Sequence, residues 1–520
     1  MTVVEMIARN ARMYPSDIAL IELRPSQKLR NQITWKDFDE RVNRVANALI
    51  ERGVRKGDRV LDWMMNSINW LEGYFGIMRT GAWPVPLNFR FGMRDLKYCA
   101  DIVEAKVMVS SQEFTEKVEA ARSQLPTIEH YIFVGQNVPP DMEGFEHILS
   151  KASPKPPEVG ISAENEAVLF FTAGTTGPPK AILLTHKNLE WAAVGQVFEH
   201  QTNHSDNFLV CAPLYHLSQV HWLGNLVVGA RGTLLTEVNP KNMFDAIYKE
   251  KVTKLFLLVP WAQDILGALD RGELRKEDYD NLSSCRRLHM GAQAIPPSIP
   301  KRWKEYFPHM LYETDFGLSE STGPGPVCLG YGNEHKIGAI GKPGLNWQTR
   351  IVNDKDEDVA QGEVGELLLR GNGVMKGYYK NPEKTAEALK GGWLHTGDMA
   401  RMDSDGFIYL VDRKKDVVIS GGENIFPVEI EAVLQGHLKV HDVAVIGVAD
   451  ERLGEIVAAI IDPKPGMTLT EEEIKEFYQA HLPKYKWPRR IIFDKVPRNP
   501  TGKIEKPKLR EKYTGKREAF

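Results

Sequence analysis

A glycine- and threonine-rich stretch, Phe170 to Lys180, has the residue types needed to bind a polyphosphate. Gly174 and Gly177 can adopt positive φ and allow the backbone to approach a ligand closely. Successive N–H groups in such a turn bind anions, and the threonine hydroxyls and the Lys180 ammonium add donors. The stretch is not a Walker A loop, because Ala181 follows the lysine where that motif has Ser or Thr. A plain Gly/Pro hairpin turn is the alternative.

Three later segments carry side chains suited to the same ligand. Glu320 supplies carboxylate oxygens, which Mg²⁺ prefers. Asp398 follows a glycine and can accept hydrogen bonds from both hydroxyls of a ribose. Lys503 follows Gly502 in a loop near the end of the chain. Read singly, these residues have ordinary alternatives as a surface carboxylate, a turn residue and a solvated lysine.

In this order and at these separations, the segments resemble the adenylate-forming superfamily of acyl-CoA synthetases, peptide-synthetase adenylation domains and firefly luciferase. The resemblance runs from about Ile33 to about Leu509, and the motif around Lys503 matches the family's catalytic-lysine motif without departure. Four positions depart from the family pattern, where Ser, Gly, a small residue and Tyr are the more usual residues: Ala173, Ala181, Gln293 and Phe316.

The resemblance implies an AMP-forming acyl-CoA synthetase that uses ATP, CoA and Mg²⁺ and passes through an acyl-adenylate. It implies catalytic roles for Lys503, Glu320, His216 and Thr172, with Glu320 as the Mg²⁺ ligand. The ATP and AMP contacts that it implies are Thr172, Ala173, Gly174, Thr175, Thr176, Gly177, Lys180, Gly291, Ala292, Gln293, Asp315, Phe316, Gly317, Leu318, Ser319, Asp398, Ile408, Arg413 and Lys503. The implied CoA contacts are Ser420, Gly421, Gly422 and Glu423. The implied acyl pocket consists of His216, Val220, Trp222, Gly291 and Gly317.

Two of these residues also have structural alternatives. His216 lies between the ATP site and the acyl pocket by resemblance, but it can equally be a core histidine with one satisfied nitrogen. Trp222 shortens the acyl tunnel by resemblance, or it simply packs in the core.

The remaining walls of the pocket are mostly apolar or small, with no obvious partner for a second charge on the substrate. We therefore expect a monocarboxylic acid, either aliphatic of medium length or cyclic or aromatic. Three rival functions stay open at this point: an adenylation enzyme that loads a carrier protein, a luciferase-like oxygenase, and a nucleotide-binding regulator without turnover.

Composition limits the remaining possibilities. The 520 residues are too many for one ordinary core, and the formal net charge of −3 gives no reason to expect nucleic acid. The four cysteines are scattered without metal spacing and suit a reducing compartment. The N-terminus lacks the pattern of a signal peptide, and the most apolar run is too short to cross a bilayer. We therefore expect a cytoplasmic protein without an integral membrane segment, either a monomer or a homodimer.

The elements that must position these residues follow an α/β pattern. Thr34 reads as the cap of a helix that continues to Ile50, and buried strand candidates then alternate with helices, which predicts layered parallel sheets. Residues 1 to about 60 otherwise look helical, and 211–216 look like a short strand ending in a loop.

The charge run 412–416 interrupts two apolar strands and suits a connector between domains, with a hairpin as the alternative. We predict an N-terminal domain over 1–412, a hinge over 413–416 and a mobile α+β lid over 417–520, and the resemblance makes Lys415 the hinge. It also implies that the lid rotates after adenylation, withdrawing Lys503 and presenting Gly421 and Gly422 to the pantetheine path.

Overall fold

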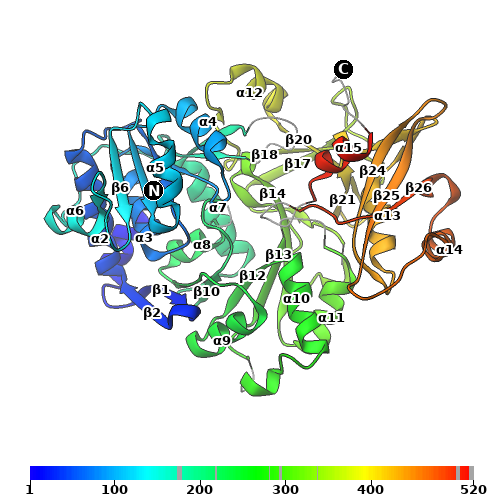
Figure 1. Cartoon of the computed structure of the whole chain (residues 1–520), viewed down its shortest axis with the longest axis horizontal. Coiled ribbons are helices and arrows are strands. Elements are labelled where there is room, and N and C mark those ends of the chain that lie inside the picture. The colour runs from blue at the N-terminus through cyan, green and yellow to red at the C-terminus, as the bar shows by residue number, and fades with distance from the viewer. Residues whose placement is uncertain are drawn as a thin grey trace.

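The computed structural model describes residues 1–172, 179–216, 220–279, 282–291, 295–336, 338–498 and 504–514, and it confirms the α/β class. Within these residues the strands form five sheets. Figure 1 shows a large N-terminal region, coloured blue to yellow, beside a smaller C-terminal unit in orange and red. No helix of the described residues is both long and apolar enough to cross a membrane.

The largest sheet has the strand order β16-β15-β14-β13-β12-β10-β11-β1-β2. Its middle strands pair in parallel, and antiparallel pairs occur towards both edges. Because parallel strands end at one edge of a sheet, β12, β13 and β14 deliver their carboxyl ends to a common place, where ligands of α/β proteins bind. The strands are β1 Ile18–Arg24, β2 Leu29–Thr34, β10 Asn207–Val210, β11 Arg231–Leu235, β12 Lys254–Leu258, β13 Arg287–Gly291, β14 Leu311–Leu318, β15 Gly323–Cys328 and β16 Lys342–Pro343.

A second parallel sheet, β4-β3-β5-β6-β7, lies in the N-terminal part of the chain. Its strands are β3 Arg59–Trp63, β4 Trp83–Pro86, β5 Val107–Ser111, β6 His130–Val134 and β7 Glu143–Gly144. The helices around it are α1 Val3–Met13, α2 Trp35–Glu51, α3 Ile68–Arg79, α4 Met93–Val103, α5 Thr115–Ala121 and α6 Phe145–Lys151. The predicted start of α2 is confirmed, because the Thr34 side chain accepts a hydrogen bond from the Asp37 N–H.

Two local expectations were wrong. Residues 1 to about 60 include the strands β1 and β2, whose first member is held by pairing with β11 far along the chain. The expected strand over 211–216 is a loop, since β10 already ends at Val210. Pro213 cannot donate a backbone hydrogen bond to a ladder, and its carbonyl accepts one from the His216 N–H in a turn.

A small antiparallel sheet, β19-β9-β8, carries the glycine- and threonine-rich stretch. Its strands are β8 Glu166–Phe171, β9 Ala181–Thr185 and β19 Gly377–Tyr378. Helix α7 (His186–Glu199) follows β9 directly, with Thr185 as its N-cap, and packs against α8 (Val220–Val228). The helices α9 Pro240–Glu250, α10 Val259–Asp270 and α11 Ser298–Tyr306 contribute to a second hydrophobic core with the parallel strands.

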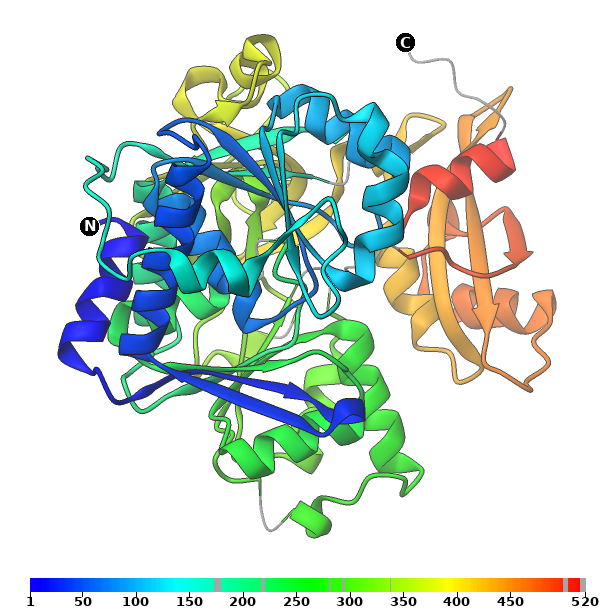
Figure 2. The same cartoon turned by 60° about the vertical axis from the view of Figure 1, so that its left-hand side comes forward.

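The predicted hinge lies where the chain passes from one sheet to another. The sheet before it is β17-β18-β20-β21 and the sheet after it is β23-β22-β25-β24, to which β26 adds through β25. Since β21 pairs with β20 and β22 pairs with β23 and β25, the described pairings do not make the segment between them a hairpin. The C-terminal unit stands out as a lobe in Figure 2.

The elements of these two sheets and their helices complete the fold. Before the predicted hinge they are β17 Trp347–Val352, β18 Gly365–Gly371, α12 Pro382–Ala388, β20 Leu394–Met402 and β21 Ile408–Arg413. After it they are β22 Val418–Ser420, β23 Glu423–Ile425, α13 Pro427–Gln435, β24 Val440–Asp450, β25 Gly454–Pro463, α14 Glu471–His481, β26 Arg490–Phe493 and α15 Lys506–Thr514.

Candidate functional site

The proposed phosphate loop closes a β-hairpin. Phe171 pairs with Ala181 across β8 and β9, and the Thr172 N–H donates a hydrogen bond of 3.0 Å to the Lys180 carbonyl. The loop therefore leaves and re-enters the sheet at adjacent points. Its predicted contacts Ala173, Gly174, Thr175, Thr176 and Gly177 lie outside the described residues.

Glu320 and Lys180 are brought together by a residue that the sequence did not single out, Tyr378. The Tyr378 hydroxyl donates a hydrogen bond of 2.8 Å to Glu320 Oε1, and the Lys180 Nζ lies 4.9 Å from the centroid of the Tyr378 ring. Burial and the neighbouring Glu320 carboxylate raise the pKa of Tyr378, so the hydroxyl keeps its proton and remains a donor. Pairing of β19 with β9 places the tyrosine here, and no local sequence signal predicts that pairing.

The end of β14 leads into Glu320. Leu318 is the last residue of the strand, and its N–H is capped by the Ser321 hydroxyl at 2.8 Å, while Ser319 begins the short 3₁₀ turn that holds Glu320. Phe316, the predicted adenine contact, is 8% exposed and belongs to a hydrophobic cluster that also contains Ile408, another predicted contact. These two predicted contacts therefore belong to one hydrophobic core.

The two predicted ribose contacts bind each other. Asp398 and Arg413 are partners in the register of β20 and β21, and Arg413 Nε lies 2.8 Å from Asp398 Oδ1. The Asp398 carboxylate is almost fully buried and the guanidinium is partly exposed. Arg413 thus fixes the orientation of the carboxylate, which is the residue with the acceptor capacity that a ribose requires.

The predicted acyl-pocket residues lie on several different elements of the N-terminal region. Gly291 ends β13, and a Cβ atom there would lie 3.3 Å from a Phe256 ring carbon. A side chain at this position would therefore crowd the phenylalanine ring. Trp222 is buried in the core and stacks on Trp35 with ring centroids 6.5 Å apart, which supports the packing alternative. His216 is half-buried at the end of the loop after β10. Val220 begins α8, while Ala292 and Gln293 lie outside the described residues.

The strands that lead into the site carry a buried polar pair, which the sequence did not single out. His289 and Asp315 lie two residues before Gly291 and Gly317, and His289 Nε2 is 3.1 Å from Asp315 Oδ1. Both side chains are almost completely buried. Sequence patterns alone give no sign of this pair, because the two strands meet only through the parallel pairing of β13 and β14.

The predicted CoA contacts form an exposed turn in the C-terminal unit. Ser420 and Glu423 pair across β22 and β23, and the two residues between them, Gly421 and Gly422, have φ of 59° and 87°. Positive φ at both central positions is the conformation that joins two strands tightly and that glycine adopts without strain. A side chain is absent from both positions, so a ligand can approach this backbone closely.

Lys503 lies outside the described residues, but its flanks are described. Arg498 and Ile504 form a bridge, and the Glu505 N–H donates 2.8 Å to the Pro497 carbonyl, so the Lys503 loop leaves and rejoins the unit at one place. Arg498 is anchored by a two-point ion pair with Asp442 at 2.7 Å. Lys415, the predicted hinge, belongs to a short 3₁₀ turn between the two sheets.

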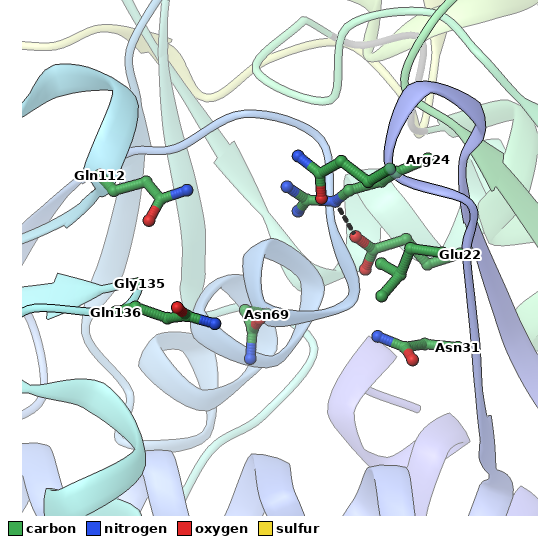
Figure 3. A pocket seen from close by; sticks show the side chains of 9 residues that line it. Glu22, Arg24, Asn31, Asn69, Gln112, Gly135 and Gln136 are labelled. Atoms are coloured by element: carbon green, nitrogen blue, oxygen red, sulfur yellow. Dashed lines mark hydrogen bonds and ion pairs between the residues drawn. The ribbon is translucent and has the colours of Figure 1, made fainter.

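A separate polar pocket of about 430 Å³ contains none of the predicted residues. Figure 3 shows it between Glu22, Arg24 and Asn31 on one side and Asn69, Gln112 and Gln136 on the other. Glu22 and Arg24 form an ion pair at 2.6 Å within it.

The family model for AMP-binding enzymes matches residues 7–379, and the model for the AMP-binding enzyme C-terminal domain matches residues 429–503. The chain is 34% identical to feruloyl-CoA synthase from Amycolatopsis sp over 97% of its length and 98% of that protein. It is 29% identical to long-chain-fatty-acid–CoA ligase FadD13 of Mycobacterium tuberculosis over 98% of both chains. The crystal structure of the anthranilate CoA ligase AuaEII in complex with anthranoyl-AMP is similar with a TM-score of 0.90 and 26% identity, over 99% of this chain and 97% of that one.

Proposed function

The chain belongs to the AMP-binding enzyme family and is an AMP-forming acid–thiol ligase, and from this premise we propose which of its residues carry the two half-reactions. The overall reaction converts a carboxylic acid, ATP and CoA to acyl-CoA, AMP and diphosphate. In the first half, a carboxylate oxygen attacks the α-phosphorus and diphosphate leaves. In the second, the CoA sulfur attacks the acyl carbon, its proton is lost, and AMP leaves. Neither half requires a nucleophile from the protein.

The single observation that carries the assignment is the convergence of Glu320, Tyr378 and Lys180 beside the hairpin loop. A carboxylate, a lysine and a glycine-rich turn at one place form a site for a triphosphate with its cation. Asp398, oriented by Arg413, holds the ribose, and Lys503 bridges the substrate carboxylate and the α-phosphate as negative charge develops there.

Glu320 fits the role of a Mg²⁺ ligand. It is half-buried, and the Tyr378 hydroxyl holds one of its oxygens in a defined position. Mg²⁺ is commonly bound through one or two carboxylates together with substrate phosphates. When bound, the ion neutralises charge on the phosphates, while the protein's own residues position them.

The C-terminal unit acts as the lid in this proposal. The change of sheet between Arg413 and Val418 supports a hinge over 413–416, with the lid over 417–520. In one orientation the lid brings Lys503 to the phosphates, and in the other it brings Ser420, Gly421, Gly422 and Glu423 to CoA. Such a motion is a hinge closure in which a few residues absorb the change.

We propose a monocarboxylic acid as the substrate, either medium-chain aliphatic or cyclic or aromatic. The test is a diphosphate-release assay over a panel of carboxylic acids with ATP and Mg²⁺, followed by product analysis with free CoA and with a phosphopantetheinylated carrier protein. Diphosphate release with at least one acid and thioester on free CoA are expected. Release of no diphosphate, or thioester on the carrier alone, would overturn the proposal.

A further inference from the structure

We infer, on the premise of the proposed function, that the acyl pocket ends at a buried polar cluster and that the substrate carries a hydroxyl or carbonyl group at the end remote from its carboxylate. The cluster consists of Gln196, His200, His289 and Asp315. It joins the end of helix α7 to the strands β13 and β14, which carry the predicted pocket residues Gly291 and Gly317 near their carboxyl ends.

The strands place two members of the cluster directly behind the predicted pocket. Side chains two residues apart on a strand share a face, so His289 continues the face of Gly291, and Asp315 lies beside it at 3.1 Å. A Cβ atom on Gly291 would lie 3.5 Å from His289 Nε2, which shows that the imidazole is next to this glycine. A substrate group passing over Gly291 therefore meets His289 and its partner Asp315 next.

Helix α7 supplies the opposite wall. Gln196 and the C-cap His200 are four residues apart and share a face of the helix. His200 Nε2 lies 4.0 Å from Asp315 Oδ2, so this face of the helix faces β14. Gln196 Nε2 lies 3.6 Å from the place that a Cβ atom on Gly325 would take, which directs its amide at β15, the antiparallel partner of β14.

Polar atoms in this cluster are buried without a hydrogen-bond partner among the described residues. Gln196 is 1% exposed, and neither atom of its amide has a partner there; Asp315 Oδ2 has none either. A buried polar group left unpaired costs about 1–3 kcal/mol. Such groups in a native structure require an explanation, of which a missing ligand is one. A hydroxyl group both donates and accepts, so it can satisfy a carboxylate oxygen and an amide together.

The cluster also limits the length of the substrate. On its far side the structure leaves a cavity of only about 10 Å³, lined by His200, His289, Lys254 and Arg287, among others, which is room for about one water molecule. The distance from Gly291 to His289 is two strand residues, roughly 7 Å. A ring or a short chain spans that distance, and we therefore infer a substrate of that size.

The charges of the cluster favour a neutral polar group over a second carboxylate. Glu199 and Glu313 are close enough to Asp315 to interact with it electrostatically, and burial followed by this interaction raises the pKa of both glutamates. A substrate carboxylate here would add a negative charge beside Asp315, in a place where burial and neighbouring carboxyl groups already disfavour the charged form of both glutamates. The acid is therefore a monocarboxylic acid whose ring or short chain ends in a hydroxyl or carbonyl.

The test compares acids that differ only in a distal hydroxyl or methyl group, on benzoate, phenylacetate and phenylpropanoate scaffolds, by kcat/KM for diphosphate release. On the scaffold that the enzyme prefers, the wild-type protein should favour the hydroxylated acid by at least about 100-fold, because a site built to hydrogen-bond a hydroxyl rejects the analogue without it. Gln196→Met, which preserves volume, and His289→Leu should reduce that ratio to below about 10, with KM for ATP within twofold of wild type. Gln124→Met, on the surface, is the matched control.

Each remaining outcome decides the matter. A preference for the methylated acids, turnover of unsubstituted aliphatic acids alone, or an unchanged ratio in a Gln196→Met protein with a wild-type melting temperature would overturn the inference and leave the ligase activity standing. Absence of diphosphate release with every acid would instead refute the proposed function.

The ligand atoms of His200, His289 and Asp315 lie within 4.8 Å of one another, so a metal ion is the competing occupant. One equivalent of zinc in the purified protein, lost in His289→Leu, would overturn the inference.

Discussion

The two halves of the proposed ATP site are held in different ways. In the N-terminal half, Glu320, Tyr378 and Lys180 adjoin or belong to strands whose backbone hydrogen bonds fix them relative to one another. At the predicted hinge, ion pairs tie the connector to both sides: Arg510–Asp416 to the C-terminal unit, and Lys414–Glu366 and Lys414–Asp354 to the N-terminal region. Strand ladders have one register, whereas long charged side chains can exchange partners at modest cost. This contrast is what a fixed phosphate site and a moving lid require.

Lys503→Ala is the variant with the largest expected effect, because it removes the only catalytic residue assigned to the moving half. We expect adenylate formation to fall by at least about 10²–10³-fold, the usual cost of one electrostatic contact to the transition state. Conversion of a supplied acyl-adenylate and CoA to thioester should persist, since the proposed rotation of the lid withdraws Lys503 in that half-reaction. Diphosphate release and thioester formation are measured separately.

Lys508→Ala is the matched control, because that lysine lies on the following helix, is 64% exposed and pairs locally with Glu505. Both half-reactions should be unchanged in it. Equal loss of both half-reactions in a folded Lys503→Ala protein would show that the two halves of the site do not act separately.

Lys415→Pro tests the hinge in the opposite direction. Proline fixes φ near −65° and restricts the residue before it, so the connector can no longer absorb a large rotation. Thioester formation from a supplied acyl-adenylate should fall by about two orders of magnitude, while adenylation persists. Lys415→Ala, which removes the side chain and leaves the backbone free, should retain both activities. If the proline variant kept full thioester formation, the lid would not turn at this residue.

Asp412 sharpens the comparison, because it joins the two halves directly. It is the residue before Arg413, and its carboxylate accepts a 3.0 Å hydrogen bond from the Val428 N–H at the start of α13. Burial raises the pKa of Asp412 from 3.8 to about 6. The folded state therefore holds the proton more tightly, and this group's contribution to stability is complete below about pH 4 and is lost as pH rises through about 6.

Asp412→Asn removes that titration. The free energy of unfolding of the variant relative to wild type should therefore increase by about 3 kcal/mol between about pH 4 and about pH 7. Urea unfolding at a series of pH values measures the difference. A difference that does not change with pH would show that the pKa of Asp412 is not raised in the folded protein.

The parts of the fold that could be predicted from the sequence are those that depend on residues close together in the chain. The Thr34 side chain caps α2 through a residue only three positions further on, and the helix was expected there. Strand β1 was missed because its partner β11 lies about two hundred residues away in the chain. The His289–Asp315 pair was missed for the same reason, since only the pairing of β13 with β14 brings those residues together.

Tyr378→Phe breaks the fixed half of the site at the residue that sequence reasoning missed, and its effect should be the smallest. The change removes the hydroxyl that donates to Glu320 but keeps the ring beneath the Lys180 ammonium. A hydrogen bond to a charged group contributes about 1.5–3 kcal/mol, so we expect kcat/KM for ATP to fall by about 10–100-fold, through the position of Glu320. A higher Mg²⁺ requirement should accompany the loss.

Tyr379→Phe, at the next residue, which is partly exposed, is the control and should behave as wild type. If Tyr378→Phe needed no more Mg²⁺ than wild type, the tyrosine would support the sheet and not the carboxylate. The fixed half would then depend on its strands alone.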